Sequence, residues 1–177
     1  MKRIDPGRAP GRAEIEAVVE AATWAPNHHM TEPWRFVVVT GAGRARLGDA
    51  LAAAAAASPQ AARASPEVVE RERRKPLEAP FIVALIGSPR RAERIVPQEE
   101  LVAAGAALQN MLLAAHSLGL ASFVRTGEGA YSEEVRALFG MGEGETMVAM
   151  VYLGYAAGPV PPGRRTAAAQ KTAWMES

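Results

Sequence analysis

The longest helical pattern in the sequence runs from Pro97 to Leu118 and is apolar on nearly every face. One stripe at helical spacing consists of small and apolar residues, namely Leu101, Gly105, Leu108, Leu112 and Ala115. Val102, Met111 and Leu113 widen this stripe. Such a helix has to be covered on several sides, which is difficult for a single domain of this size. The pattern therefore predicts a central helix and a homodimer that shares it.

Four segments have the composition of β-strands, and helical patterns separate them. The expected strands cover residues 34–40, 81–86, 121–126 and 146–155. Phe81–Ile86 is an uninterrupted apolar run, so we expect it in the middle of the sheet. The other expected helices cover residues 13–25, 44–57, which is mostly alanine and must bury a shallow face, 67–75, whose charges suggest a solvated face, and 132–138. The pattern predicts one domain, residues 1–177, with an α/β or α+β three-layer arrangement.

The composition excludes several kinds of chemistry. The chain of 177 residues contains no cysteine, which rules out thiol nucleophiles, cysteine-ligated zinc, iron–sulfur clusters and disulfide bonds. Its net charge of +1 argues against nucleic acid or an anionic membrane as a partner. The first residues lack an apolar signal sequence, and no stretch approaches the roughly 18 apolar residues of a membrane span. We therefore expect a cytoplasmic protein that acts on a small ligand.

The densest group of polar and aromatic residues is the segment from Ala25 to Phe36, which reads Ala-Pro-Asn-His-His-Met-Thr-Glu-Pro-Trp-Arg-Phe. It connects an expected helix to an expected strand, where ligand-binding groups often gather. His28 and His29 are possible metal ligands, but adjacent side chains point in different directions and no other cluster has metal spacing. The alternative is a capped loop with exposed imidazoles, so we expect no metal site.

Two further groups have the chemistry of a binding site. Residues 124–127 read Val-Arg-Thr-Gly and follow a strand, where they could contact a planar, electron-rich ring or a phosphate. Arg164 and Arg165 are either phosphate ligands or solubilising charge. Residues 41–43 are not a dinucleotide-binding loop, because Arg46 stands where a third glycine would be. No serine has the sequence context of a hydrolase nucleophile.

Several motifs, taken in order, resemble the nitroreductase family. The matching segments are residues 25–28 (Ala-Pro-Asn-His), 31–36 (Thr-Glu-Pro-Trp-Arg-Phe), 104–105 (Ala-Gly), 109–115 (Gln-Asn-Met-Leu-Leu-Ala-Ala), 118–120 (Leu-Gly-Leu) and 152–155 (Tyr-Leu-Gly-Tyr). The similarity runs from the first helix to the last strand. It is closest to the small single-domain members that carry the Ala-Pro-x-His loop.

The resemblance implies a fold, a cofactor and a partner. The fold is an α+β three-layer sandwich with a mixed or antiparallel central sheet, and two chains interlock into a homodimer. FMN lies in the groove between the subunits, and residues 156–177 form a tail that docks on the partner subunit. The implied residues around the flavin ring are Trp24, His28, Val124, Arg125, Thr126 and Gly127. Arg164 and Arg165 would approach the phosphate, and a cation such as Arg125 would stabilise negative charge on the reduced ring.

The family's Arg-Arg-Ser type motif, which holds the FMN phosphate, is not in the sequence, which begins about where that motif would end. Lys2 and Arg3 are the basic residues nearby, and we expect them to take part in phosphate binding. Hydrogen bonds to charged groups contribute about 1.5–3 kcal/mol each. FMN is therefore expected to bind more weakly than it does with the complete motif.

The resemblance also implies an activity, that of an NAD(P)H-dependent FMN oxidoreductase. Electrons from NADH or NADPH would pass through flavin N5 to nitroaromatics, quinones or similar small acceptors by a ping-pong route, without a catalytic side chain. A dehydrogenase or dehalogenase on the same scaffold is the competing enzyme hypothesis. A flavin-free or flavin-sensing binding protein is the alternative from another class.

Overall fold

The computed structural model describes residues 4–5, 7–60, 64–90, 94–160 and 162–176 of the chain. Its α-helices are α1 (Arg12–Thr23), α2 (Gly43–Ala56), α3 (Pro66–Arg74), α4 (Pro97–Ser117) and α5 (Glu133–Leu138). Its strands are β1 (Trp34–Thr40), β2 (Phe81–Gly87), β3 (Ala121–Arg125) and β4 (Thr146–Gly154). Short 3₁₀ helices among the described residues are η1 (His28–Met30), η2 (Lys75–Glu78), η3 (Glu128–Tyr131) and η4 (Ala168–Lys171). Each expected helix and strand is present, which confirms the predicted order of elements.

The strands form one antiparallel sheet in the order β1-β2-β4-β3. β2 pairs with β1 from Trp34 opposite Gly87 to Thr40 opposite Phe81, and it pairs with β4 on its other side. Every residue of β2 from 82 to 86 is completely buried. The prediction that this apolar run is central is therefore confirmed, and the sheet with its helices confirms the α+β class.

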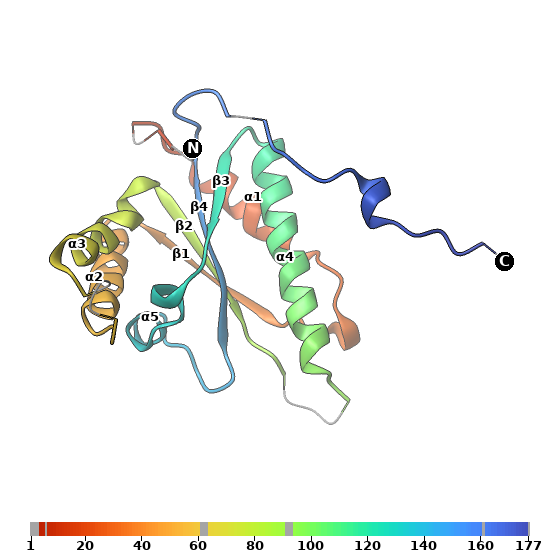
Figure 1. Ribbon diagram of the computed structural model, residues 1–177, viewed down its shortest axis with the longest axis horizontal. Coiled ribbons are helices and arrows are strands. Elements are labelled where there is room, and N and C mark those ends of the chain that lie inside the picture. Colours follow the sequence, from red (N-terminus) through yellow and green to blue (C-terminus); the bar gives the residue numbers. More distant parts are fainter. Residues whose placement is uncertain (1–3, 6, 61–63, 91–93, 161, 177) are drawn as a thin grey trace.

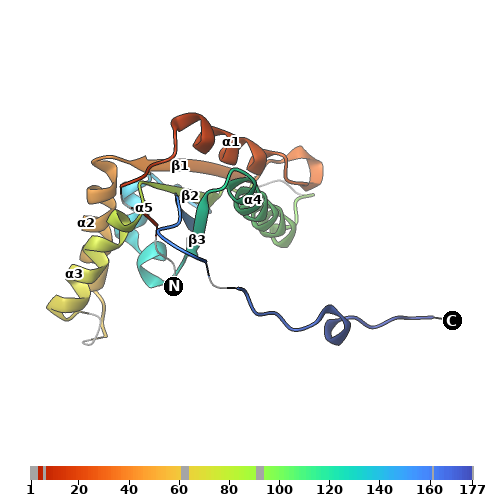
Figure 2. The ribbon, with the colours of Figure 1, turned by 90° about the horizontal axis from the view of Figure 1, so that it is seen from above.

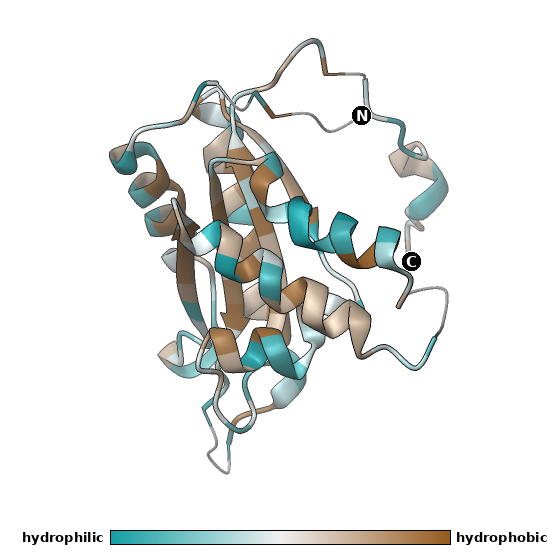
Figure 3. Cartoon of the chain, turned by 90° about the vertical axis from the view of Figure 1, so that its left-hand side faces the viewer, coloured by the Kyte–Doolittle hydropathy of each residue, from teal (hydrophilic) through white to brown (hydrophobic). Residues whose placement is uncertain are grey.

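Helices cover both faces of the sheet, which gives three layers (Figures 1 and 2). α1 and α4 lie on one face, where Val18 and Met111 pack in one cluster with Val83. α2 and α5 lie on the other face, where Leu47 packs in a second cluster with Ile82, and α3 packs against α2. Figure 3 shows the strands mostly brown, whereas the helices in front of them mix teal with brown. Within the described part of the chain, no helix is long and apolar enough to cross a bilayer.

The long helix α4 meets the sheet through small side chains. Its buried residues are Glu100, Ala103, Ala104, Ala107, Met111 and Ala115. Alanines let a helix approach a sheet closely, and several of the larger side chains of α4 lie away from the sheet. Leu101, Val102 and Leu113 are 61%, 72% and 57% exposed. One chain thus leaves one side of α4 uncovered, as expected of a helix that a single domain of this size can hardly cover.

Two capped helix ends position the segments that carry the site. Gly119 follows α4 with a φ of 73°, its N–H donates to the carbonyl of His116, and the N–H of Leu120 donates to the carbonyl of Ala115 at 2.8 Å. This arrangement ends the helix and turns the chain directly into β3. Ser132 caps α5, because its hydroxyl accepts from the N–H of Val135 at 3.3 Å. Glycine just after a helix and serine just before one are the residue types that favour these caps.

A partly buried ion pair joins β1 to the turn that precedes β4. Arg35 donates to the two carboxylate oxygens of Glu145 at 2.7 and 2.8 Å. It also donates to the carbonyl of Phe139 at 3.1 Å, and the N–H of Gly142 donates to Glu145 at 2.9 Å. The hydrogen bond from Arg35 is the main reason that the pKa of Glu145 is lowered from 4.5 to about 2. The pair ties the turn after α5 to an edge strand of the sheet.

Candidate functional site

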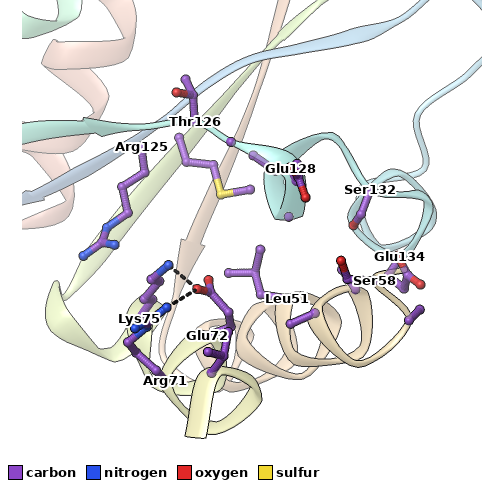
Figure 4. Close-up of a pocket in the computed structure, with 18 of the residues that line it drawn as sticks. Leu51, Ser58, Arg71, Glu72, Lys75, Arg125, Thr126, Glu128, Ser132 and Glu134 are labelled. Carbon is purple, nitrogen blue, oxygen red and sulfur yellow. Dashed lines mark hydrogen bonds and ion pairs between the residues drawn. The ribbon is translucent and has the colours of Figure 1, made fainter. Parts of the chain in front are cut away.

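A cavity of about 680 Å³ lies on the side of the sheet that α2 and α5 cover (Figure 4). Its walls are the C-terminal half of α2, one face of α3, the end of β3 with the turn that follows, and η3 with the start of α5. Met150 and Tyr152 contribute to it from β4. Cavities of this size are typical of small-molecule and cofactor sites.

Small side chains on α2 create much of this space. Leu51, Ala54 and Ala55 line the cavity from one face of α2, and Ser58 lines it just after the helix ends. Larger side chains there would occupy the space that the cavity now has. The sequence predicts that the alanine-rich helix buries only a shallow face. At its C-terminal end, this face forms a wall of the cavity.

A charged group lies on the α3 wall. Figure 4 shows Arg71 and Lys75 both directed at the carboxylate of Glu72. The side chains of Glu72 and Lys75 are only 18% and 26% exposed. The sequence indicated a solvated face for this segment; that is correct for Arg74, whose side chain is 73% exposed, and wrong for Glu72 and Lys75. Arg71 and Lys75 are four residues apart, and this spacing was the available signal.

Arg125 is the cation at the β3 end of the cavity. Its guanidinium forms an ion pair with Glu78 and lies 5.0 Å from the ring centre of Phe123 and 4.9 Å from that of Tyr152. Its Nε is buried and has no hydrogen-bond partner among the described residues. A buried donor without a partner is uncommon in a folded protein and is a group that a ligand can satisfy.

The turn after Arg125 places the backbone of a glycine, without a side chain, at the cavity. Gly127 has a φ of 120° and a ψ of 176°, a conformation that is essentially restricted to glycine. Apart from Gly127 and its two chain neighbours, no atom of the described residues lies within 4 Å of the position that a Cβ would take there. The carbonyl of Gly127 accepts from the N–H of Ala130 at 2.9 Å, which holds the start of η3. A ligand can therefore approach this backbone closely.

The polar loop before β1 lies outside this cavity. His29, Met30 and Glu32 all have positive φ values, of 55°, 52° and 46°, which is unusual for residues other than glycine. Left-handed residues gather where the surrounding structure imposes a conformation. Here Glu99, on α4, binds His28 Nδ1 at 2.7 Å. The neighbouring acid, Glu100, accepts from Thr31 Oγ1 at 2.6 Å.

The residues expected to surround a ligand therefore fall into separate groups. Arg125, Thr126 and Gly127 line the cavity, and Val124 is half-buried on the same strand. Trp24, which is 79% exposed, and His28 do not line it. Arg164 and Arg165 are exposed on the tail, which extends away from the body of the chain (Figures 1 and 2). Lys2 and Arg3 lie outside the described residues.

The two histidines of the loop lie side by side at the surface. Their rings are stacked with centres 4.3 Å apart. In the described ranges, no three His, Asp or Glu side chains gather as metal ligands would. The arrangement supports the interpretation of a structured loop with exposed imidazoles.

Comparisons with known proteins agree with one another. The sequence model of the Nitroreductase family matches residues 5–155. The chain is 30% identical to YdjA of Escherichia coli K12, provisionally named as an NAD(P)H nitroreductase, over 146 residues that cover 82% of this chain and 78% of that protein. It is 28% identical to YfhC of Bacillus subtilis, which bears the same kind of name, over 81% of this chain and 73% of the relative.

Solved structures give the same result for the fold. A nitroreductase-like family protein from Bacillus cereus superposes with a TM-score of 0.81 at 24% identity, covering 100% of this chain and 91% of the other. A nitroreductase with bound FMN from Bacteroides fragilis superposes with a TM-score of 0.75 at 25% identity, covering 99% and 92% of the two chains.

Proposed function

The chain belongs to the nitroreductase family, and on that premise we propose that it binds FMN in the cavity and passes electrons from NADH or NADPH to small electrophilic acceptors such as nitroaromatics and quinones. Its relatives are named as NAD(P)H nitroreductases, and the structural neighbour from Bacteroides fragilis contains FMN. The observation that carries the proposal for this chain is the cavity itself. Its wall includes Arg125, Thr126 and Gly127, the segment expected at the flavin ring.

The cavity has the chemistry that FMN requires. Its volume of about 680 Å³ accommodates a planar ring system. The unpartnered Nε of Arg125 offers a donor to an electron-rich ring, and the open space at Gly127 allows a ring to approach the backbone. Arg71 and Lys75 add positive charge on the opposite wall.

Bound FMN would supply hydride chemistry at its N5 atom. The chain itself needs no nucleophile and offers no cysteine. Arg125 and Lys75 would provide positive potential for an electron-rich ligand, while the α2 side chains and Met150 would exclude water from its apolar side. Because one cavity would serve both donor and acceptor, they would occupy it in turn, which is the basis of the proposed ping-pong kinetics.

The active form is proposed to be a homodimer. The exposed apolar residues Leu101, Val102 and Leu113 on α4 and the 83% exposed Trp174 on the tail leave surfaces that a second copy would cover. A groove between two copies would also bring the loop with His28 from one chain to the cavity of the other. We expect sedimentation equilibrium to give twice the chain mass of 18.7 kDa. A monomer that retains FMN would contradict this arrangement.

The activity is tested by three measurements on the purified protein. We expect a yellow flavin spectrum and, with FMN added at about 100 times its Kd, a stabilisation of about 2.7 kcal/mol, which raises the melting temperature by about 5–10 °C for a chain of this size. We expect oxidation of NADH or NADPH to depend on a nitroaromatic or quinone, with parallel double-reciprocal plots. If the protein is colourless and FMN leaves its melting temperature unchanged, the flavin-free binding protein is favoured instead. Turnover of other substrates in place of these acceptors would favour the dehydrogenase or dehalogenase.

A further inference from the structure

Each cation named on the cavity wall has a carboxylate partner. Lys75 and Arg71 meet Glu72, and Arg125 meets Glu78. Glu78 is the last residue of η2, 47 positions from Arg125 in the sequence, so only the folded chain brings this pair together. Unlike Glu72, Glu78 is not among the described residues that line the cavity. Glu78 therefore acts on the cavity as the partner of Arg125 and through its charge, and not as a lining side chain.

The Arg125 guanidinium is held in place by its surroundings. The rings of Phe123 and Tyr152 are stacked 4.9 Å apart at 21°, and the guanidinium carbon lies about as far from each ring centre. The Arg125 side chain is 28% exposed, and Glu78 binds its Nη2. Figure 4 shows the guanidinium directed toward the side of the cavity where Lys75 lies. The contact with Glu78 thus fixes the direction of the Arg125 guanidinium and reduces the net charge on this part of the wall.

Tyr152 shows that the pair acts on the inside of the cavity. Burial is the main cause that raises the pKa of the Tyr152 phenol, the charge of Arg125 lowers it, and the charge of Glu78 raises it. Tyr152 lines the cavity. A ligand beside Tyr152 would therefore experience both charges, in opposite directions.

We propose that Glu78 is a positioning residue that sets the reduction potential of the bound flavin, because it holds the Arg125 guanidinium on the cavity wall and offsets its charge there. This inference rests on the proposed function, since it requires FMN in the cavity. A reduced flavin carries more negative charge than an oxidised one, so a cation beside the ring favours reduction. The Glu78 carboxylate opposes that effect and keeps the flavin a stronger reductant toward acceptors.

The test measures the two-electron midpoint potential of FMN bound to the full-length protein by dye-coupled reduction. For Glu78→Gln, we expect a more positive potential, with the affinity for reduced FMN relative to oxidised FMN raised about tenfold, which is about 30 mV for a two-electron couple. We expect Glu78→Asp to stay near the wild-type potential, because the carboxylate is retained. Arg125→Ala should move the potential in the negative direction.

Glu16→Gln is the matched control. Glu16 also pairs with an arginine, Arg12, at 2.6 Å, but on α1 and on the opposite face of the sheet. We expect it to leave the potential unchanged. The inference is overturned if FMN bound to Glu78→Gln has the wild-type midpoint potential, or if that potential shifts no more than it does in Glu16→Gln. It is also overturned if Glu78→Gln folds but no longer binds FMN. Failure of the wild-type protein to bind FMN would overturn the proposed function first, and this inference with it.

Discussion

Replacing Ala55 by tryptophan is expected to abolish FMN binding while leaving the fold intact. Ala55 lies on α2, is half-buried and lines the cavity beside Leu51 and Ser58. An indole at this position has to occupy the cavity or move α2, and overpacking of this kind typically costs 1–3 kcal/mol. We expect the affinity for FMN to fall by about two decades or more, which corresponds to about 2.7 kcal/mol.

The measurement is a fluorescence titration with FMN, accompanied by circular dichroism of the free protein. Ala53→Trp is the matched control, because Ala53 lies on the same helix but is exposed and does not line the cavity. It should bind FMN as the wild type does. Equal affinity in the Ala55 and Ala53 variants would show that FMN does not occupy this cavity.

Removing the charge of Glu145 is expected to cause the largest loss of stability among the substitutions considered. The pKa of Glu145 is held at about 2 in the folded chain, against 4.5 without these contacts, mainly by the hydrogen bond from Arg35. A shift of one pKa unit corresponds to about 1.4 kcal/mol. Because the pair is partly exposed, we expect Glu145→Gln to lower the free energy of unfolding at pH 7 by about 2–3 kcal/mol.

The effect has a defined dependence on pH. Because the folded pKa of Glu145 is lowered, the carboxylate stabilises the fold fully above the unfolded pKa of about 4.5, and this contribution is lost as pH falls toward 2. Urea denaturation of the wild type should therefore show a loss between about pH 5 and pH 2 that is reduced in Glu145→Gln. Glu16→Gln, which removes the charge from an exposed i,i+4 pair, should leave stability essentially unchanged. Parallel pH profiles for the wild type and Glu145→Gln would contradict the assignment.

Much of the secondary structure could be predicted because its signals are local. The expected strand at residues 34–40 matches β1 from Trp34 to Thr40, and the helix that starts at Pro97 ends at Ser117, two residues before Gly119. Caps, turn glycines and hydrophobic periodicity act between residues a few positions apart. The sequence therefore predicts them without knowledge of the tertiary fold.

The candidate site was predictable only in part. Arg125, Thr126 and Gly127 were expected at a ligand and do line the cavity. The signals were a cation, a hydroxyl and a glycine directly after a strand, to which the family resemblance added a role at the flavin ring. Glu72 and Lys75 were interpreted as solvated charges. A short charged helix has the same composition whether its charged side chains face solvent or line a cavity. The role of Trp24 and His28 at a flavin, like the homodimer, stays a prediction.

What the sequence alone determined is the class of fold, the order of its elements and the family, since these depend on local patterns and on motifs in a fixed order. The tertiary structure decided which side chains meet. It turned the alanines of α4 toward the sheet and left Leu101 and Leu113 exposed. It also joined Glu78 to Arg125 and Arg35 to Glu145 across 47 and 110 positions. Contacts over such separations depend on how sheet and helices pack in three dimensions, and the sequence pattern around either partner does not specify the other.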